Sequence, residues 1–501
     1  MTSNIRALTS PVRQSTLIAP GDLDAEAVTL FAAGFRLALI AGHDDGERLR
    51  AVYVFVAGSP DRRVELQVCL DPTRPVVPSL ARLSFPASRF EREMYDLFGI
   101  EPVGHPFLRP LVLHQHWPAG WHPMRHNAGE SPPMRTDAEP SPFVAVEGPG
   151  VYEIPVGPVH AGLIEPGHFR FSVVGETILK MKARLWFVHR GIEKLFERRD
   201  VVDGVVLAER ISGDTAVGHN LAYCLAVEDA CRIDLPVEAG QQRALLLELE
   251  RIYNHVADVG ALCNDVGYGI AQARALTLRE QLLRLNAKVT GHRLLRGAIR
   301  PGVTSLRQLP TEVELDQIAS RFEDLVDLAT TNTVVMDRFK GTAVLSKSDA
   351  TAIGTLGVVA RGSGLTLDAR AAQPFVDLGP GLPVVVEDAG DVMARFSVRV
   401  REVRASLHLV RVLAGAARHL EVVAPAGARR GGSGLGIVES WRGTIIHRVE
   451  VDASGRLTRC KVVDPSFLNW PALSVALADT IVPDFPLANK SFNLSYAGND
   501  L

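Results

Sequence analysis

The stretch ELERIYNHVADVGALCNDVG, residues 248–267, carries two different faces of one long helix. With the residues just before it, it places apolar side chains at alternating spacings of four and three, at Leu245, Leu249, Ile252, Val256, Val259 and Cys263. That period predicts an amphipathic helix with its apolar stripe in a core. A second, mostly polar face carries Arg251, His255, Asp258, Leu262 and Asp265. Buried polar groups need partners, and we expect a Gly- and Pro-containing loop at 157–167 to supply them.

Two further segments have helical signals. The first runs over 277–296, where Thr277 and Glu280 have capping-box spacing and Gly297 with Pro301 marks the stop. The second begins near residue 391 and repeats apolar side chains at Val392, Phe396, Val400, Val403, Leu407 and Val410. Several long helices predict a helical bundle at the centre of the fold.

Strand-like segments flank this bundle. Residues 49–58 and 62–70 are rich in β-branched and aromatic side chains and predict a strand pair, with a helix over 23–40 before it. Short strands are expected near 151–155 and 169–174. After a Gly-rich loop at 429–436, residues 444–452 and 456–464 predict a hairpin. The fold class is therefore α+β: a small α/β domain followed by a helix-rich domain with flanking sheets.

The Pro-rich, polar stretch NAGESPPMRTDAEPSP, residues 127–142, predicts a linker. It divides the chain into a domain at 1–126 and a larger one at 143–501. We expect protease to cut this linker first.

Composition excludes several classes of protein. The chain has 501 residues, 47% hydrophobic and 22% charged, with a net charge of −3 and no basic block that predicts nucleic-acid binding. The five cysteines form no CxxC pair, which argues against an iron–sulfur or zinc site of its own: Cys69, Cys224, Cys231, Cys263 and Cys460. The first residues have no apolar signal-peptide core, and no run of about 18 apolar residues predicts a membrane span. We expect any membrane role to come through partners.

The string FEREMYDLFGIEPVGHPFLRPLVL, residues 90–113, is the first dense motif. Taken alone, it is a charged helix start and a Gly-His-Pro turn, or a set of metal ligands at Glu91, Glu93, Asp96 and His105. The whole string resembles the E-R-E-x-x-D-x-F-G-I and G-H-P-x-L-R signature of the 30-kDa-type subunit of complex I. The resemblance covers roughly 45–126 and implies a docking module without a cofactor.

The larger part resembles a second family over nearly all of 143–501. The strings that carry the resemblance follow in order: GPVHAGLIEPGHFRF (157–171), HRGIEK (189–194), AERISGDTAVGHNLAYCLAVE (208–228), ELERIYNHVADVGALCNDVG (248–267), VMDR (335–338) and ARGSGLTLDAR (360–370). They are similar to the 49-kDa-type subunit of complex I and to its homologue, the large subunit of membrane-bound nickel–iron hydrogenases. Fusion of both modules resembles the hydrogenase-4 and formate hydrogenlyase branch.

The chain departs from the hydrogenases at the metal ligands. Soft thiolates hold nickel and iron, and the family supplies them from E-R-x-C-G-x-C and D-P-C-x-x-C motifs. The first motif reads Glu209-Arg210-Ile211-Ser212-Gly213-Asp214-Thr215 here. For the second, Ser491 with Leu494, or Ser466 with Asn469, would stand in place of the cysteines. We therefore predict no metal site and no nickel–iron chemistry.

In complex I the corresponding cavity binds a quinone head group through a His, a supporting Asp and a Tyr. The resemblance implies His160 or His168 as the histidine and Asp265 as its support, a set suited to proton donation. The tyrosine falls on Gly213. Glu193 and Arg210 face the cavity in relatives, and Ser212 and Thr215 would line it. The alternatives are a buried ion pair for Glu193 or Arg210 and hydrogen-bonded structural roles for the histidines.

These resemblances imply a core subunit of a membrane-associated, complex I-like complex of the NADH:quinone oxidoreductase type. The subunit would shape the quinone or acceptor cavity beside a small iron–sulfur (20-kDa-type) subunit, on membrane antiporter-like subunits at the cytoplasmic face. It would bind no cofactor itself, while the iron–sulfur cluster would belong to the partner. The other subunits would choose the electron donor. The alternative is a degenerate, hydrogenase-like scaffold for assembly or ion translocation.

Overall fold

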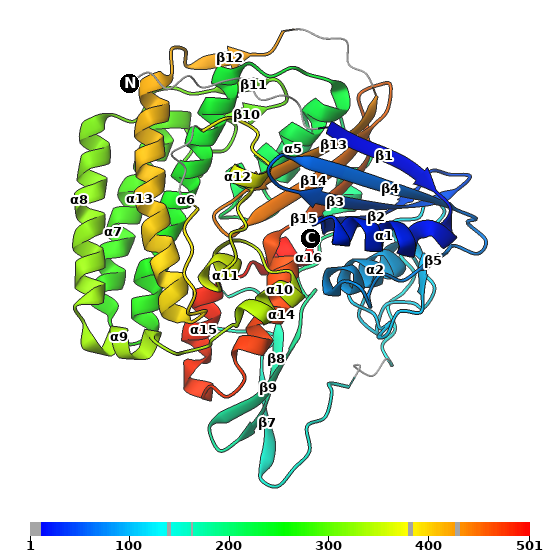
Figure 1. Ribbon diagram of the computed structural model, residues 1–501, viewed down its shortest axis with the longest axis horizontal. Coiled ribbons are helices and arrows are strands. Elements are labelled where there is room, and N and C mark those ends of the chain that lie inside the picture. Colours follow the sequence, from blue (N-terminus) through cyan, green and yellow to red (C-terminus); the bar gives the residue numbers. More distant parts are fainter. Residues whose placement is uncertain (1–11, 138–141, 162–163, 379–383, 426–430) are drawn as a thin grey trace.

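The computed structural model describes residues 12–137, 142–161, 164–378, 384–425 and 431–501 (Figure 1). The amino-terminal part is a four-stranded sheet in the order β1-β4-β3-β2, with β1 parallel to β4 and the other pairs antiparallel. Its elements are β1 (Val12–Ile18), α1 (Leu23–Ala32), β2 (Arg36–Asp44), β3 (Leu49–Ala57), β4 (Arg62–Leu70), β5 (Val76–Pro78), α2 (Phe85–Phe98) and β6 (Glu101–Val103). The predicted strand pair is confirmed. The helix expected over 23–40 stops at Ala32, and β2 takes up the rest of that range.

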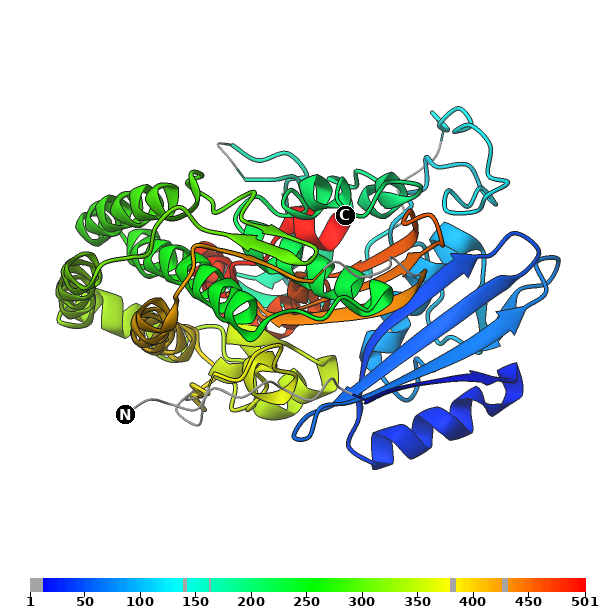
Figure 2. The same cartoon turned by 90° about the horizontal axis from the view of Figure 1, so that it is seen from above.

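A bundle of long helices forms the other side of the molecule (Figures 1 and 2). These helices are α6 (Val237–Asp265), α7 (Gly269–Thr290), α8 (Glu312–Thr330) and α13 (Val392–Ala416); a fifth long helix, α5 (Ala216–Cys231), lies beside β13 in the middle of the molecule. Helix α6 packs against α7 and α13, and the predicted stripe from Leu245 to Cys263 is buried in this core. The helices predicted at 248–267 and from 391 are therefore confirmed.

The larger part also contains shorter helices. They are α3 (Ile192–Phe196), α4 (Gly204–Ala208), α9 (Thr333–Phe339), α10 (Lys347–Ile353), α11 (Gly357–Gly362), α12 (Ala369–Ala372), α14 (Pro465–Ala476), α15 (Phe485–Phe492) and α16 (Tyr496–Asp500). The chain also has single 3-10 turns at Pro20–Asp22 and Val482–Asp484. No helix in the described part of the chain is both long and apolar enough to cross a bilayer.

The capping box predicted at Thr277 is wrong. Helix α7 already begins at Gly269, and the Thr277 hydroxyl donates to the carbonyl of Ala273 one turn earlier. Helix α7 ends at Thr290, and the next residue, Gly291, has a φ of 87° that suits a glycine cap. A capping box does occur at the start of α8, where Thr311 and Glu314 exchange hydrogen bonds.

Three small antiparallel sheets complete the larger part. They are β7 (Val151–Val156), β8 (His168–Val174) and β9 (Thr177–Arg184); β10 (Ile299–Arg300), β11 (Val303–Ser305) and β12 (Glu421–Val423); and β13 (Gly432–Glu439), β14 (Thr444–Val451) and β15 (Leu457–Val463). The predicted hairpin is confirmed as β14 and β15. The predicted Gly-rich loop is mostly strand, because β13 begins at Gly432 and pairs with β14; residues 429 and 430 lie outside the described part.

The glycines of β13 let this sheet lie directly on α5. A Cβ on Gly434 would come within 1.9 Å of the Ala226 carbonyl oxygen, and a Cβ on Gly436 within 1.9 Å of the Ala222 carbonyl oxygen. Only glycine permits so close an approach of two backbones.

The two modules share one buried interface. Apolar side chains of the amino-terminal sheet and α2 form a single cluster with side chains of β13, β14, β15 and α14. Arg448 on β14 donates to both oxygens of Glu65 on β4, at 2.9 and 3.0 Å, and both side chains are buried. The modules are therefore joined by packing and by charge as well as by the connecting segment.

Cleavage of the connecting segment should leave the two modules together. Residue 128 of this segment is bound to the amino-terminal module, because the Ala128 carbonyl accepts from the Trp121 indole at 3.0 Å; residues 138–141 lie outside the described part. Because the segment is Pro-rich and polar, we expect limited proteolysis to cut first in 127–142. Because the modules share a core, we expect size exclusion to recover both fragments in one peak. First cuts inside 160–300 would contradict the boundary, and separate fragment peaks would contradict the shared core.

Candidate functional site

Ser212 and Thr215 lie on the loop between α4 and α5, and both are buried. The carboxyl group of Glu250 on α6 fixes the start of α5, because its oxygens accept from the N–H groups of Val217 at 2.7 Å and Gly218 at 2.9 Å. Burial raises the pKa of Glu250 to about 8. The loop is thereby held against the central helix of the bundle.

An ion pair closes the centre of this loop. Arg442 Nη1 and Nη2 donate to the two oxygens of Asp214, both at 2.7 Å, and Nη1 also donates to Thr215 Oγ1 at 3.1 Å. Although burial opposes it, Arg442 holds the pKa of Asp214 well below its usual range. The guanidinium carbon lies 3.9 Å from the ring centre of Trp441. The Arg442 side chain is 7% exposed and that of Asp214 38%, so the pair is open on its carboxylate side.

The carboxyl-terminal segment brings a third hydroxyl to the loop. Ser495 Oγ lies 2.9 Å from Ser212 Oγ, and the backbone N–H of Ser495 donates to Ser466 Oγ at 2.9 Å. Ser491 is turned elsewhere, since its Oγ accepts from Arg395 and donates to the Ala488 carbonyl. The segment facing the loop therefore has the form Asn493-Leu494-Ser495-x-x-Gly498.

This geometry favours a third register for the second cysteine pair. On it, the segment 493–498 corresponds to the D-P-C-x-x-C motif, with Ser495 and Gly498 at the cysteine places, while Ser491 is turned away from the loop. A Cβ on Gly498 would lie 2.5 Å from Asp464 Oδ2. Asp464 thus occupies the space that a side chain at 498 would need.

Asp464 is the first of three buried side chains that are linked by hydrogen bonds. Its Oδ2 is 3.0 Å from His219 Nε2, and His219 Nδ1 is 3.2 Å from His447 Nε2. All three side chains are at most 1% exposed. Although burial opposes it, the bond from His219 holds the pKa of Asp464 below its ordinary value.

These side chains do not fit a nickel–iron centre. Three of the four places carry a hydroxyl, at Ser212, Thr215 and Ser495, and the fourth, Gly498, has no side chain. Nickel and iron of this type need soft thiolate ligands. The Asp214–Arg442 pair and Asp464 fill the region with hard oxygen and nitrogen atoms that already have hydrogen-bond partners.

Comparison with known proteins assigns the modules. The model of the 30-kDa subunit of respiratory-chain NADH dehydrogenase matches residues 17–133, that of the 49-kDa subunit matches 265–427, and that of nickel-dependent hydrogenase matches 190–263. Formate hydrogenlyase subunit 5 of Escherichia coli is 32% identical over 453 residues, which cover 87% of this chain and 79% of the relative. The chain belongs to the fused complex I and hydrogenase large-subunit family.

Two further relatives show the range of this family. Hydrogenase-4 component G of Escherichia coli is 31% identical over 82% of this chain and 73% of its own length. The C/D subunit of the NADH-quinone oxidoreductase of Phocaeicola vulgatus is 29% identical over 68% of this chain and 70% of its own length. A chain of the membrane-bound sulfane sulfur reductase, an archaeal respiratory membrane complex, has the same fold, with a TM-score of 0.63, 24% identity, and coverage of 70% of this chain and 99% of that chain.

Glu193 was predicted from the family to face the cavity. In the structure it is a buried residue that forms ion pairs. Its oxygens lie 3.0 Å from Lys461 Nζ and 2.8 Å from Arg459 Nη1. Burial opposes ionisation, but these two cations lower the pKa of Glu193 to about 2. The alternative role, an ion pair that fixes the fold, is the one the contacts support. Arg210 is exposed, and its Nη1 donates to the Val206 carbonyl at 2.8 Å.

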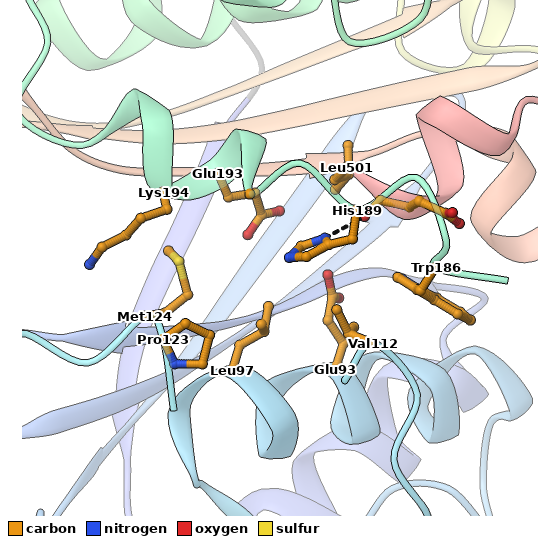
Figure 3. A pocket seen from close by; sticks show the side chains of 12 residues that line it. Glu93, Leu97, Val112, Pro123, Met124, Trp186, His189, Glu193, Lys194 and Leu501 are labelled. Atoms are coloured by element: carbon orange, nitrogen blue, oxygen red, sulfur yellow. Dashed lines mark hydrogen bonds between the residues drawn. The ribbon is translucent and has the colours of Figure 1, made fainter. Parts of the chain in front are cut away.

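Glu193 also lines a small pocket at the junction of the modules (Figure 3). Glu93 approaches it from α2, opposite Glu193, and His189 Nδ1 is 2.7 Å from the Asp500 carbonyl oxygen. The pocket measures about 50 Å³, far below the several hundred Å³ of a typical ligand site. We therefore assign it a packing role.

The family histidines and Asp265 have separate partners. His160 Nε2 is 2.9 Å from the Gly167 carbonyl oxygen, and His168 meets the Phe143 ring edge-on at 5.1 Å between centres. Asp265 ends α6, and burial raises its pKa while Lys490 opposes that shift. In the described part of the chain, no hydrogen bond joins Asp265 to His160 or His168. A common pocket for them stays a prediction.

The polar face of α6 finds partners other than those expected. Arg251 donates to the carbonyls of Glu439 and Ser440, at 2.6 and 3.1 Å. His255 Nε2 lies 2.9 Å from Glu402 on α13. Since these partners come from α13 and from the end of β13, the expectation that the 157–167 loop satisfies this face is wrong.

Asp258, on the same face, links the bundle to the site. Its Oδ2 accepts from Arg399 on α13 at 2.8 Å, and its Oδ1 accepts from Asn493 at 2.6 Å. Asn493 in turn offers its carbonyl to Arg442 Nε at 2.6 Å. Asp214, Arg442 and Asn493 were not predicted as site residues, although Asp214 stands inside the first cysteine motif of the family.

Proposed function

We propose that this chain is a core subunit of a membrane-associated, complex I-like respiratory complex that works without a nickel–iron centre. The observation that carries the proposal is that no cysteine stands at Ser212, Thr215, Ser495 and Gly498, the positions that we assign to the family's four thiolates, and that Arg442 pairs with Asp214 in the same loop. The relatives are named as a formate hydrogenlyase subunit, a hydrogenase-4 component and a subunit of an NADH-quinone oxidoreductase. Because the site has no thiolates, quinone reduction of the NADH-quinone oxidoreductase type suits it better than hydrogenase activity.

The acceptor cavity would lie between the loop at 209–215 and a small iron–sulfur partner, with a quinone or a similar molecule as the acceptor. Gly213 is exposed and has open space around its Cβ position, so the loop offers room on that side. Membrane antiporter-like subunits at the cytoplasmic face would complete the assembly. The iron–sulfur cluster would belong to the partner subunit. This chain would orient the acceptor and hold the protons that the acceptor takes up.

A specific feature favours a second candidate, a scaffold without turnover of its own. Counted from the A-Y-x-L-A-V-E string, Gly213 would stand where complex I has its quinone tyrosine, and Arg442 already pairs with Asp214 in this loop. A subunit kept for assembly or ion translocation would need only this closed arrangement.

Metal analysis tests the central point. We expect complex purified from its own host, grown with added nickel, to contain only background nickel. The reason is that hydroxyl and glycine replace the soft ligands the metal requires. One nickel per chain would overturn the proposal.

The variant Asp265→Asn separates the two candidates. Burial raises the pKa of Asp265, which suits a group that holds and passes a proton. We expect this variant to slow quinone-dependent oxidation by the purified complex by about a hundredfold or more, in the range of a lost acid–base group, with assembly unchanged. The exposed Asp324→Asn on α8 is the matched control. Reduced assembly with unchanged turnover per complex would favour the scaffold.

A further inference from the structure

A basic cleft of about 490 Å³ lies between α2, the segment at 107–115, β9 and α14, on the side of the molecule where the modules meet. Its volume falls within the range of about 300–1,000 Å³ that is usual for ligand sites. Six cationic side chains line it: Arg89, Arg92, Arg109, Lys180, Lys182 and Arg184. Among the residues that the structure describes, no Asp or Glu lines it. Glu153, just outside, neutralises Lys182.

Arg89, at the floor of the cleft, is a buried cation without a carboxylate partner in the described part of the chain. The residue is 9% exposed, and its Nε has no hydrogen-bond partner there. Nη2 makes one long bond, 3.4 Å, to Asn499 Oδ1. Burial, and next the neighbouring Arg92, lower the pKa of Arg89 to about 9.

The acids nearest to Arg89 are committed to other groups. Glu93 binds Lys461 Nζ at 2.7 and 2.8 Å, and Asp500 Oδ2 accepts from the N–H of Val188 at 3.0 Å. A buried charge normally has a partner, since desolvation is costly. Among the residues that the structure describes, Arg89 therefore has no anion in direct contact, and its guanidinium carbon lies 4.7 Å from the Phe467 ring centre.

The rim adds further cations and apolar surface. Lys180 and Arg109 are exposed, and the Arg109 guanidinium carbon lies 4.5 Å from the Phe107 ring centre. Phe85 is 42% exposed and Phe107 47%. Cations beside exposed aromatic rings suit a ligand that carries an anionic head and an apolar body.

We propose that this cleft binds a phosphate-bearing amphiphile. Arg89, Arg109 and Lys180 hold the phosphate oxygens, while the apolar body lies against Phe85, Phe107 and Trp186. The same chemistry is offered by a membrane phospholipid and by a soluble phosphate ester. The site is separate from the loop at 209–215, and its existence does not depend on the proposed function.

Calorimetry on the full chain tests the proposal. Dihexanoyl-phosphatidylglycerol, kept below its micelle concentration, should bind, and binding should weaken as salt rises because the contacts are ionic. The double variant Arg109→Gln/Lys180→Gln should weaken binding about tenfold or more. The control Arg321→Gln/Lys340→Gln removes the same charge from exposed positions outside the cleft and should bind like the parent.

Arg89→Met examines the floor of the cleft with an apolar side chain of similar length. We expect it to abolish detectable binding without lowering the unfolding temperature, because it removes an uncompensated buried cation. If this variant does not fold, the rim variants still decide the question, since Arg109 and Lys180 are exposed.

Two further arms identify the source of the phosphate. Flotation with phosphatidylcholine vesicles containing phosphatidylglycerol, lost in the rim variant, would assign a membrane lipid. Binding of the monomeric lipid or of inorganic phosphate without flotation would support a soluble phosphate ester. Absence of binding to all three probes, or equal binding by parent and rim variant, would overturn the proposal. Displacement by polyglutamate with no phosphate binding would make the cleft a protein docking surface and would also overturn it.

Discussion

Replacing Lys461 by methionine is expected to lower the free energy of unfolding by about 3–5 kcal/mol, the usual cost of removing one partner from a buried ion cluster. Lys461 is 2% exposed and joins Glu93 on α2 to Glu193 on α3, with Nζ 2.7 and 3.0 Å from their oxygens. Glu193 keeps Arg459 as a second cation. Glu93 would be left buried without the cation that it binds directly, so the amino-terminal module should undock first.

Chemical denaturation of the full chain, followed by circular dichroism, measures this loss. Lys288→Met is the matched control, because Lys288 pairs with Glu314 at 2.7 Å on the surface and should cost less than about 1 kcal/mol. Glu93→Gln added to Lys461→Met should restore part of the stability. Burial already raises the pKa of Glu93, so the penalty should shrink as pH falls and this carboxylate takes up a proton. Equal losses for Lys461→Met and Lys288→Met would refute the interface cluster.

The second large effect is expected from a single methyl group. Gly436→Ala would place a Cβ 1.9 Å from the Ala222 carbonyl oxygen and 2.8 Å from the Ala226 nitrogen, both backbone atoms of α5. Neither atom can turn away as a side chain can, so strand and helix must separate. We expect a loss of about 3 kcal/mol or more, at the upper end of the cost of overpacking a core.

The same measurement with Gly415→Ala provides the comparison. Gly415 lies in α13 with open space at its Cβ position, so alanine there should be neutral or stabilising by up to about 1 kcal/mol. Gly434→Ala, which meets the Ala226 oxygen at 1.9 Å, should behave like Gly436→Ala. If Gly436→Ala unfolds at the same denaturant concentration as the parent, the direct contact of β13 with α5 is wrong.

Local sequence signals predicted several elements. Helices α6 and α13 repeat apolar side chains at helical spacing, and the segments of β14 and β15 are strand-like and joined by a short turn; the structure confirms all four. The prediction of a loop at 429–436 was wrong because glycine is typical both of turns and of strands that pack closely against another backbone. Here glycine at 434 and 436 serves contact with α5, which is a tertiary property that no local pattern carries.

For the site, the sequence specified one half more closely than the other. The loop with Ser212 and Thr215 stands beside a recognisable string, which sets its position in the sequence. The carboxyl-terminal segment has neither cysteine that would set its register, so the sequence alone left two registers open, and the contact of Ser495 with Ser212 favours a third. Arg442 is 228 residues from Asp214 in the chain, so their pairing depends on the fold alone.

Because the two modules are covalently fused, weakening the interface between them cannot release one from the other. The segment 127–142 keeps the amino-terminal module near its docking site, so redocking is an intramolecular event at a local concentration of order millimolar. Variants that break the Glu93–Lys461 cluster should therefore open and reclose rather than lose the module to dilution. Fusion also fixes the two modules at equal copy number, so an assembly that incorporates one always incorporates the other.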